Sequence, residues 1–189
     1  MASPAKLAHV VYCTRRFDEM LDWYQRVFEA KVQHQNPVIT FLTWDDEHHR
    51  FALVNLDALD PDGVDPGVRS SVGVNHVAYT YASVGDLLGT YSRLKERGVM
   101  PYWRVHHGLT LSLYYSDPDG NRMEFQVDCF DTMEESNAFI RGEVMAANPI
   151  GIAFDPDDLL QRHLDGVPEA ELLIQPNGPV AEIPREEGF

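Results

Sequence analysis

Residues 7–12 read Leu-Ala-His-Val-Val-Tyr, and residues 74–79 read Val-Asn-His-Val-Ala-Tyr. An offset of 67 positions aligns His9 with His76. The same offset aligns three further pairs of identical residues, namely Tyr12 with Tyr79, Leu21 with Leu88, and Tyr24 with Tyr91. Four matches in one register predict that the chain holds two copies of one structural unit.

Both copies predict the same order of secondary structure. Each begins with a short apolar run that is typical of a strand, and apolar residues at spacings of three and four then indicate a helix. The helical residues are Phe17, Met20, Leu21, Tyr24 and Phe28 in copy one, and Val84, Leu87, Leu88, Tyr91 and Leu94 in copy two. Gly98 suits the residue just beyond the second helix. Strand-like runs close the copies at 38–44 and 50–56, and at 109–115 and 122–127.

The pattern therefore predicts an α+β fold built from two βαβββ repeats, although the second strand of each is poorly marked. The expected parts are a first module at 6–57, a linker rich in Pro, Gly and Asp at 58–73, a second module at 74–130, and an extension at 131–189. Residues 132–147 of the extension look helical, with Asp131 or Thr132 as the N-cap. Asp155 and Pro156 can start another short helix, and the tail after Gln175 looks irregular. The extension could cover a mouth of the core or make a subunit contact.

Composition excludes several classes of protein. The 189 residues include 30 Asp and Glu against 15 Lys and Arg, a net charge of −15, which argues against a nucleic-acid-binding face. No apolar run reaches the roughly 18 residues of a membrane span, and the first residues lack the apolar core of a signal peptide. Cys13 and Cys129 are too few for a disulfide scaffold. We expect a soluble protein of a reducing compartment, the cytoplasm.

The paired histidines are candidates for metal binding. His9 and His76 each fall in an apolar strand-like run at equivalent places in the two copies. A lone histidine on a strand is more often structural. If the copies pack about a pseudo-twofold axis, however, both side chains can point into one shared cavity, so a structural role and a metal-binding role are both open at this point.

A carboxylate completes the candidate set. Glu124 follows the turn Asp117-Pro118-Asp119-Gly120-Asn121, and a shift of 72 positions aligns residues 45–53 with residues 117–125. Ala52 then stands where copy two has Glu124. Two histidines and one carboxylate leave positions open on a metal, which suits a non-haem Fe(II) that binds a chelating substrate and dioxygen. A closed structural zinc site would want a fourth ligand.

The repeat, His9, His76 and the run from Asp117 to Glu124 resemble the vicinal oxygen chelate superfamily. Within it, the chain is most similar to the small, single-domain type I extradiol dioxygenases, which cleave catechol or 2,3-dihydroxybiphenyl. The resemblance covers roughly residues 6–130 and more loosely 148–151. It implies that the two repeats form one barrel-like sheet, and that His9, His76 and Glu124 bind Fe(II). Mn(II) suits the same ligands.

The resemblance also implies residues around the metal. The family keeps a His-His-x-x-Ala run, here residues 48–52, whose second histidine is an acid–base residue, so His49 takes that role. Strict strand alternation would instead put His48 on the same face as Ala52, so His48 stays open.

A further segment that matches the family spans residues 106–115. His107 matches the histidine that hydrogen-bonds a substrate oxygen, with His106 as the alternative. Tyr114 lies ten residues before Glu124, as the family's active-site tyrosine does.

The implied function is cleavage of a catecholic ring next to its diol, with both atoms of dioxygen entering the product. The expected partners are therefore the small aromatic substrate and O2, and the family often forms homodimers or higher homo-oligomers. Two alternatives use the same fold. A glyoxalase-like isomerase or epimerase would usually need a second carboxylate or amide ligand from copy one, which Ala52 does not supply. A protein that sequesters an antibiotic would not need the metal ligands.

Overall fold

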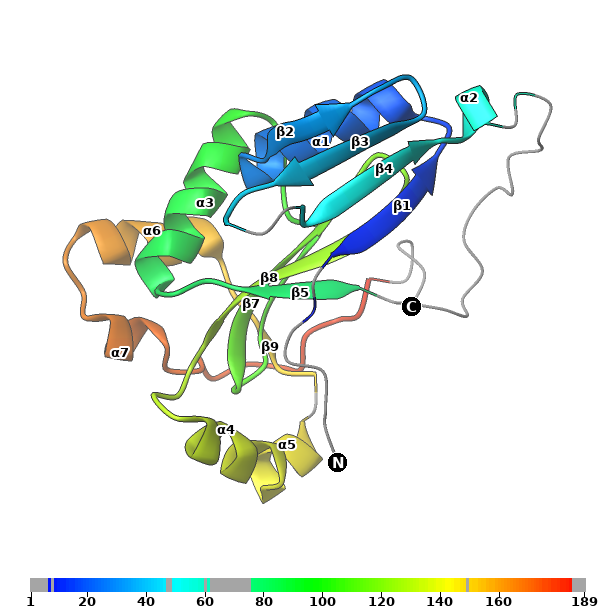
Figure 1. Ribbon diagram of the computed structural model, residues 1–189. Helices are drawn as coiled ribbons and strands as arrows, with labels where there is room; N and C mark the ends of the chain where they lie inside the picture. Colours follow the sequence, from blue (N-terminus) through cyan, green and yellow to red (C-terminus); the bar gives the residue numbers. More distant parts are fainter. Residues whose placement is uncertain are drawn as a thin grey trace. The chain divides into compact units, whose positions relative to one another are not determined.

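The computed structural model describes residues 7, 9–46, 49–59, 61, 76–148 and 150–184 (Figure 1). Its strands are β1 (Val10–Thr14), β2 (Lys31–Gln35), β3 (Ile39–Thr43), β4 (Phe51–Asn55), β5 (Val77–Thr80), β6 (Trp103–His106), β7 (Thr110–Ser116), β8 (Arg122–Asp128) and β9 (Ile152–Ala153). Its helices are α1 (Phe17–Phe28), α2 (Leu56–Leu59), α3 (Val84–Glu96), α4 (Met133–Ile140), α5 (Glu143–Ala147), α6 (Pro156–Leu164) and α7 (Glu169–Leu172). None of the described helices is long and apolar enough to cross a membrane.

Two sheets carry the predicted repeat. The first has the strand order β1-β4-β3-β2, and the second has the order β5-β8-β7-β6-β9. The first strand of each copy pairs in parallel with its last strand, and the other pairs within each copy are antiparallel. The predicted βαβββ order is therefore confirmed, including the two poorly marked strands β2 and β6. The extension adds β9 to the edge of the second sheet, beside β6.

The chain divides into two compact units, each with its own sheet. One contains residues 1–69 and 117–121, and the other contains residues 70–116 and 122–189. The turn Asp117–Asn121 belongs with the first unit, where the Tyr24 hydroxyl donates a hydrogen bond of 3.0 Å to Oδ2 of Asp117. Most of the linker expected at 58–73 lies outside the described residues, so the predicted domain bounds remain predictions.

The apolar stripe of α1 builds the core of the first unit. Met20, Tyr24 and Val27 are fully buried, as are Phe51 and Leu42, which are cross-strand neighbours on β4 and β3. The ring centroids of Tyr24 and Phe51 lie 4.5 Å apart. The helix therefore covers one face of its sheet, as the spacing of three and four predicts.

The second unit uses α3 in the same way. The hydroxyl of Ser83 accepts a hydrogen bond from the backbone N–H of Asp86 and so caps the helix. Gly98 has φ +75°, which confirms it as the residue just beyond the helix. Helix α6 of the extension lies against α3 (Figure 1), where the Tyr91 hydroxyl donates a 2.9 Å hydrogen bond to Asp157 Oδ1.

The helical segment expected at 132–147 forms with an interruption. Thr132 is the N-cap of α4, in a capping box with Glu135. The helix ends at Ile140, and Gly142, in an extended conformation, is the N-cap of α5. Asp155 caps α6 as predicted, with Pro156 in its first turn. The short helix α7 was not apparent in the sequence.

Candidate active site

Strand register makes Ala52 and Glu124 equivalent. In the first sheet Ala52 pairs with Val11 of β1 and with Phe41 of β3. In the second sheet Glu124 pairs with Ala78 of β5 and with Tyr114 of β7. Because the strand orders are the same, the predicted alignment of Ala52 with Glu124 is confirmed.

The second sheet brings His76 and Glu124 together. His76 immediately precedes β5 rather than lying inside it, and His9 precedes β1 in the same way, which corrects the sequence-based placement. Glu124 is buried on β8, the parallel neighbour of β5, and its Oε2 lies 3.1 Å from Nε2 of His76. Two donors at right angles and about 2.1 Å from one metal ion lie about 3 Å apart. The pair therefore fits two neighbouring metal ligands.

Hydrogen bonds hold Glu124 in its ionised form. Burial by itself would raise its pKa, but hydrogen bonds with His76, Ser112 and Tyr114 outweigh burial and lower the pKa below its ordinary value. Ser112 and Tyr114 reach the carboxylate because they share one face of β7. A carboxylate must lose its proton before it binds a metal, so this setting favours ligation.

His107 joins this cluster and is held from the extension. Its Nδ1 lies 2.6 Å from the backbone carbonyl oxygen of Ile150, which can only accept a hydrogen bond, so Nδ1 carries the proton. Its Nε2 lies 2.9 Å from the Tyr114 hydroxyl and 3.8 Å from Oε1 of Glu124. Burial lowers the pKa of His107, so its neutral form is favoured, and its Nε2 then competes with the Glu124 carboxylate for the single hydroxyl proton of Tyr114.

His106 has a structural environment. Its Nε2 lies 2.9 Å from the carbonyl oxygen of Leu173, and the backbone N–H of Gly108 donates to its Nδ1 at 3.1 Å. Both ring nitrogens are therefore engaged with backbone groups. The structure places His107, and not His106, beside Tyr114 and Glu124.

In the first unit, His9 and His49 come together. Their ring centroids lie 4.2 Å apart, and the ring of His49 lies 4.7 Å from that of Phe41. Because Phe41 is the cross-strand partner of Ala52, His49 lies on the side of the sheet that holds Ala52. Strict alternation favoured His48, which lies outside the described residues. His49 precedes the start of β4 at Phe51, so the alternation of a strand need not extend to it.

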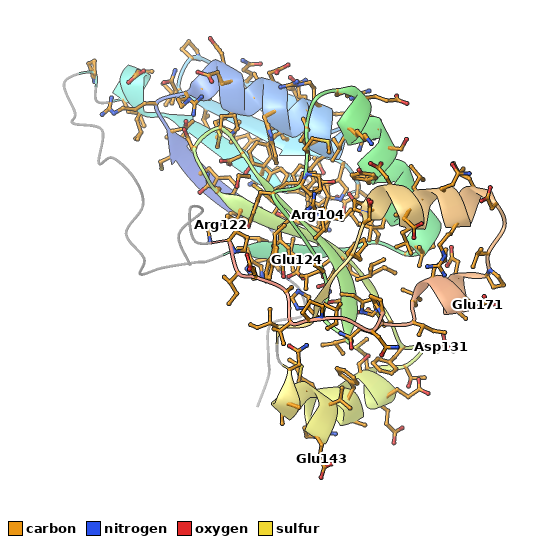
Figure 2. The ribbon with its side chains drawn as sticks, turned by 180° about the vertical axis from the view of Figure 1, so that it is seen from behind. Arg104, Arg122, Glu124, Asp131, Glu143 and Glu171 are labelled. Carbon is orange, nitrogen blue, oxygen red and sulfur yellow. The ribbon has the colours of Figure 1, made fainter. Side chains whose placement is uncertain are left out.

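A cavity of about 380 Å³ opens beside Glu124 in the second unit. It lies between one face of the β7–β8 hairpin and the helices α4 and α5. Figure 2 shows Glu124 on the sheet and Glu143 on α5. The lining residues are His107, Leu109, Thr110, Tyr114, Glu124, Gln126, Asp128, Met133, Ser136, Asn137, Ile140 and Met145. The sequence predicts that the extension either covers a mouth of the core or makes a subunit contact. This cavity supports the first role, because α4 and α5 cover it.

Most residues in this part of the site carry no recognisable sequence signal. Strand alternation with Tyr114 is a signal for Ser112, because both then face Glu124. No comparable signal marks the cavity-lining residues of α4 and α5, since apolar residues on a short helix predict burial of any kind. The Ile150 carbonyl is a backbone group, and no side-chain motif reports its contact with His107.

Among the residues that the structure describes, no three His, Cys, Asp or Glu side chains form a group that could hold a metal ion. His76 and Glu124 supply two candidate ligands in the second unit. The third predicted ligand, His9, belongs to the first unit.

Comparison with known proteins agrees with the repeat and its strand order. Residues 6–125 match the Glyoxalase/Bleomycin resistance protein/Dioxygenase superfamily. The chain belongs to this superfamily. Two curated members from Rhodococcus globerulus are similar over most of their length. Biphenyl-2,3-diol 1,2-dioxygenase 2 is 42% identical over 89% of this chain and 86% of its own. Biphenyl-2,3-diol 1,2-dioxygenase 3 is 41% identical over 93% and 90%.

Solved structures of the superfamily share the fold at low sequence identity. Lactoylglutathione lyase from Agrobacterium tumefaciens has a TM-score of 0.53 and 15% identity, and the match covers 67% of this chain and 96% of the lyase. The fosfomycin resistance protein FosX from Listeria monocytogenes has a TM-score of 0.52 and 17% identity, with 71% and 99% covered. At such identities the likeness establishes the fold, and the superfamily's α+β architecture is that of this chain.

Proposed function

We propose that the chain is an extradiol dioxygenase, which cleaves the aromatic ring of a catecholic substrate next to its diol and adds both atoms of O2. The observation that carries the proposal is the cluster of His76, Glu124, His107 and Tyr114 at a cavity, in a chain closely related to two biphenyl-2,3-diol dioxygenases. The substrate of these relatives makes an aromatic diol with a second ring the first candidate.

The superfamily and the relatives imply a metal cofactor, and the proposed metal is Fe(II), with Mn(II) as the alternative. The proposed ligands are His9, His76 and Glu124. Two neutral imidazoles and one carboxylate leave a divalent ion with a net positive charge, which favours an anionic diol. When bound, the metal supplies a centre at which the diol and dioxygen meet.

The chain's own residues position the substrate and move its protons. Tyr114 and His107 would hold the diol oxygens, and this role is supported by their polar atoms, which lie within 3.8 Å of the Glu124 carboxylate or of each other. His49 would take the proton that the diol loses and return it later, since histidine exchanges protons near neutral pH. Its ring neighbour His9 would bring it close to the substrate.

Ala52 disfavours the alternative of a glyoxalase-like isomerase. Its methyl group occupies the register position at which copy two has Glu124, so the first sheet offers no matching carboxylate. A site with three protein ligands keeps room for both a chelating diol and dioxygen.

Oxygen uptake tests the proposed function. Protein loaded with Fe(II) without air is mixed with aerated buffer that contains 3-phenylcatechol or catechol. We expect one O2 consumed per diol and a yellow ring-opened product, both lost in His76→Ala. Activity with Zn(II) or Ni(II) and no oxygen uptake would instead favour the isomerase.

A further inference from the structure

The helices α4 and α5 form a roof over the cavity. Met133 and Ile140 of α4 and Met145 of α5 line the cavity. Met133 and Ile140 also keep 60% and 48% of their surface exposed, so they are not buried in the core. An apolar roof that remains this accessible is suited to contact a ligand rather than to stabilise the fold.

The roof is fixed to the active-site strand by Phe139. Gly108, next to His107, has φ +82°, and a Cβ added to it would lie 2.4 Å from Cζ of Phe139. The same ring lies 5.4 Å from the ring of Phe130. Because Gly108 has no side chain, the Phe139 ring packs directly against it. This contact fixes the position of α4 beside His107.

The floor of the cavity is one face of the β7–β8 hairpin. Glu124, Gln126 and Asp128 alternate along β8, so their side chains share that face. Glu124, with Tyr114, marks the end where the diol would bind. Four residues of a strand span about 13 Å, so the floor from Glu124 to Asp128 is long enough for two aromatic rings.

The carboxylates that line the cavity have no basic Lys or Arg beside them in the described lining. They are the carboxylates of Glu124 and Asp128. Arg104 of β6 pairs with Leu113, so it lies on the opposite face from Tyr114, and it interacts electrostatically with Asp157. Arg122 lies two residues before Glu124, at the end of β8 opposite to Asp128. Figure 2 labels both arginines and Glu124.

We propose that the α4–α5 roof and Asp128 determine which diols the site accepts. The roof takes the second, apolar ring of a neutral aromatic diol, and Asp128 disfavours a diol whose side chain ends in a carboxylate. The proposal rests on the proposed function, because it assumes that the diol binds at the Glu124 end. It assigns a role in specificity to an extension outside the two repeats.

The first experiment tests the roof. Met145→Ala and Ile140→Ala are compared with Val144→Ala, since Val144 is 60% exposed on α5 and is not among the lining residues. Calorimetry on metal-loaded protein without O2 gives Kd for 3-phenylcatechol and for catechol, and kcat/KM is then measured in air. The preference for 3-phenylcatechol over catechol should fall about tenfold in each lining variant, because a few methylene groups in an apolar pocket are worth that much. It should not change in Val144→Ala.

The second experiment tests the charge. Wild-type protein should bind 3-(2-carboxyethyl)catechol about tenfold more weakly than 3-propylcatechol, since like charges repel in a cavity. Asp128→Asn should narrow this difference, whereas the control Asp131→Asn, on an exposed residue outside the lining, should keep it. Equal binding of the two diols by the wild type would overturn this part of the proposal.

The Kd and turnover readouts distinguish a failure of the roof proposal from a failure of the proposed dioxygenase function. If the Kd preferences change as expected while no diol consumes O2, the roof is supported and the proposed dioxygenase function is wrong. If the diols are cleaved while Met145→Ala and Ile140→Ala keep the wild-type preference, the function holds and the roof proposal is wrong.

Discussion

Glu124 is the residue that distinguishes the two copies. Its register equivalent is Ala52, and this difference makes one sheet able to offer a carboxylate while the other cannot. A shift of 72 positions in the sequence is enough to find it, because the turn and the arginine that follows it align as well. The identity of the second-sheet candidate ligands could thus be read from the sequence.

The choice between His106 and His107 could not be made from the sequence. The two are adjacent, and the spacing from His107 to the tyrosines is shorter than in the two-domain enzymes of the family that the chain resembles, which keeps His106 open. The extension distinguishes the two histidines in the structure, because the Leu173 carbonyl hydrogen-bonds the ring of His106 and the Ile150 carbonyl hydrogen-bonds the ring of His107. These partners lie 67 and 43 positions away along the chain, and both are backbone groups.

Tyr114→Phe tests the hydroxyl at the centre of the cluster. The change keeps the ring but removes the group that bonds Nε2 of His107 and the Glu124 carboxylate. We expect kcat to fall about 100-fold, in the range of a lost general acid–base or positioning contact, with the fold unchanged by circular dichroism.

Tyr115→Phe is the matched control. Tyr115 is fully buried in the same strand, and its hydroxyl has no hydrogen-bond partner among the described residues. Removing that hydroxyl should leave kcat unchanged and cost no stability. Equal losses of kcat in the two variants would show that Tyr114 acts only through packing.

A turn that the Asn148 side chain holds at Ile150 and Gly151 positions His107. Oδ1 of Asn148 accepts hydrogen bonds from the backbone N–H groups of Ile150 and Gly151, at 3.2 and 2.8 Å. Gly151 has φ +103°, and a Cβ there would lie 2.3 Å from the carbonyl oxygen of His106. The turn therefore holds the Ile150 carbonyl oxygen within hydrogen-bond distance of the His107 ring.

Asn148→Ala should loosen this turn and lower kcat about tenfold while iron content stays unchanged, because a misplaced positioning group costs rate rather than metal affinity. Asn36→Ala is the control, since Oδ1 of Asn36 holds the turn between β2 and β3 by the same kind of bonds, at 2.9 and 3.0 Å. Both variants should lose about 1 kcal/mol of stability in urea denaturation. A drop in kcat for both would contradict the specific role of Asn148.

Gly108→Ala tests how α4 is seated. Alanine at this positive φ is strained by about 1 kcal/mol, and its methyl group would also clash with Phe139. Gly98→Ala separates the two effects, because Gly98 has φ +75° and nothing within 4 Å of its added Cβ. Urea denaturation should show Gly108→Ala to be the more destabilised variant. Equal losses would mean that Phe139 moves aside without cost.

Long amphipathic elements were predictable from the sequence, and short ones were not. The apolar spacing of α1 and α3 fixes their faces over three turns. In contrast, every residue of β2 is exposed, so no alternation of apolar and polar residues marks it. The break between α4 and α5 depends on Gly142, which a helix also tolerates in its interior.

At the scale of the whole molecule, the repeat predicted the topology of both sheets. It could not predict what the extension adds, because β9, α4, α5, α6 and α7 have no counterpart in the first copy. The extension contributes to the second unit an edge strand, a roof over the cavity, and backbone carbonyl partners for the rings of His106 and His107. The cytoplasmic location and the homo-oligomer remain predictions.

The proposed metal site takes His9 from the first repeat and His76 and Glu124 from the second. The deciding experiment measures the iron content of His9→Ala after loading with Fe(II) without air, together with its O2 uptake on 3-phenylcatechol. His34→Ala, which changes an exposed histidine of β2, is the control. We predict that His9→Ala loses both iron and O2 uptake while His34→Ala keeps both. Full iron content with unchanged O2 uptake in His9→Ala would show that His9 is not a ligand of the metal.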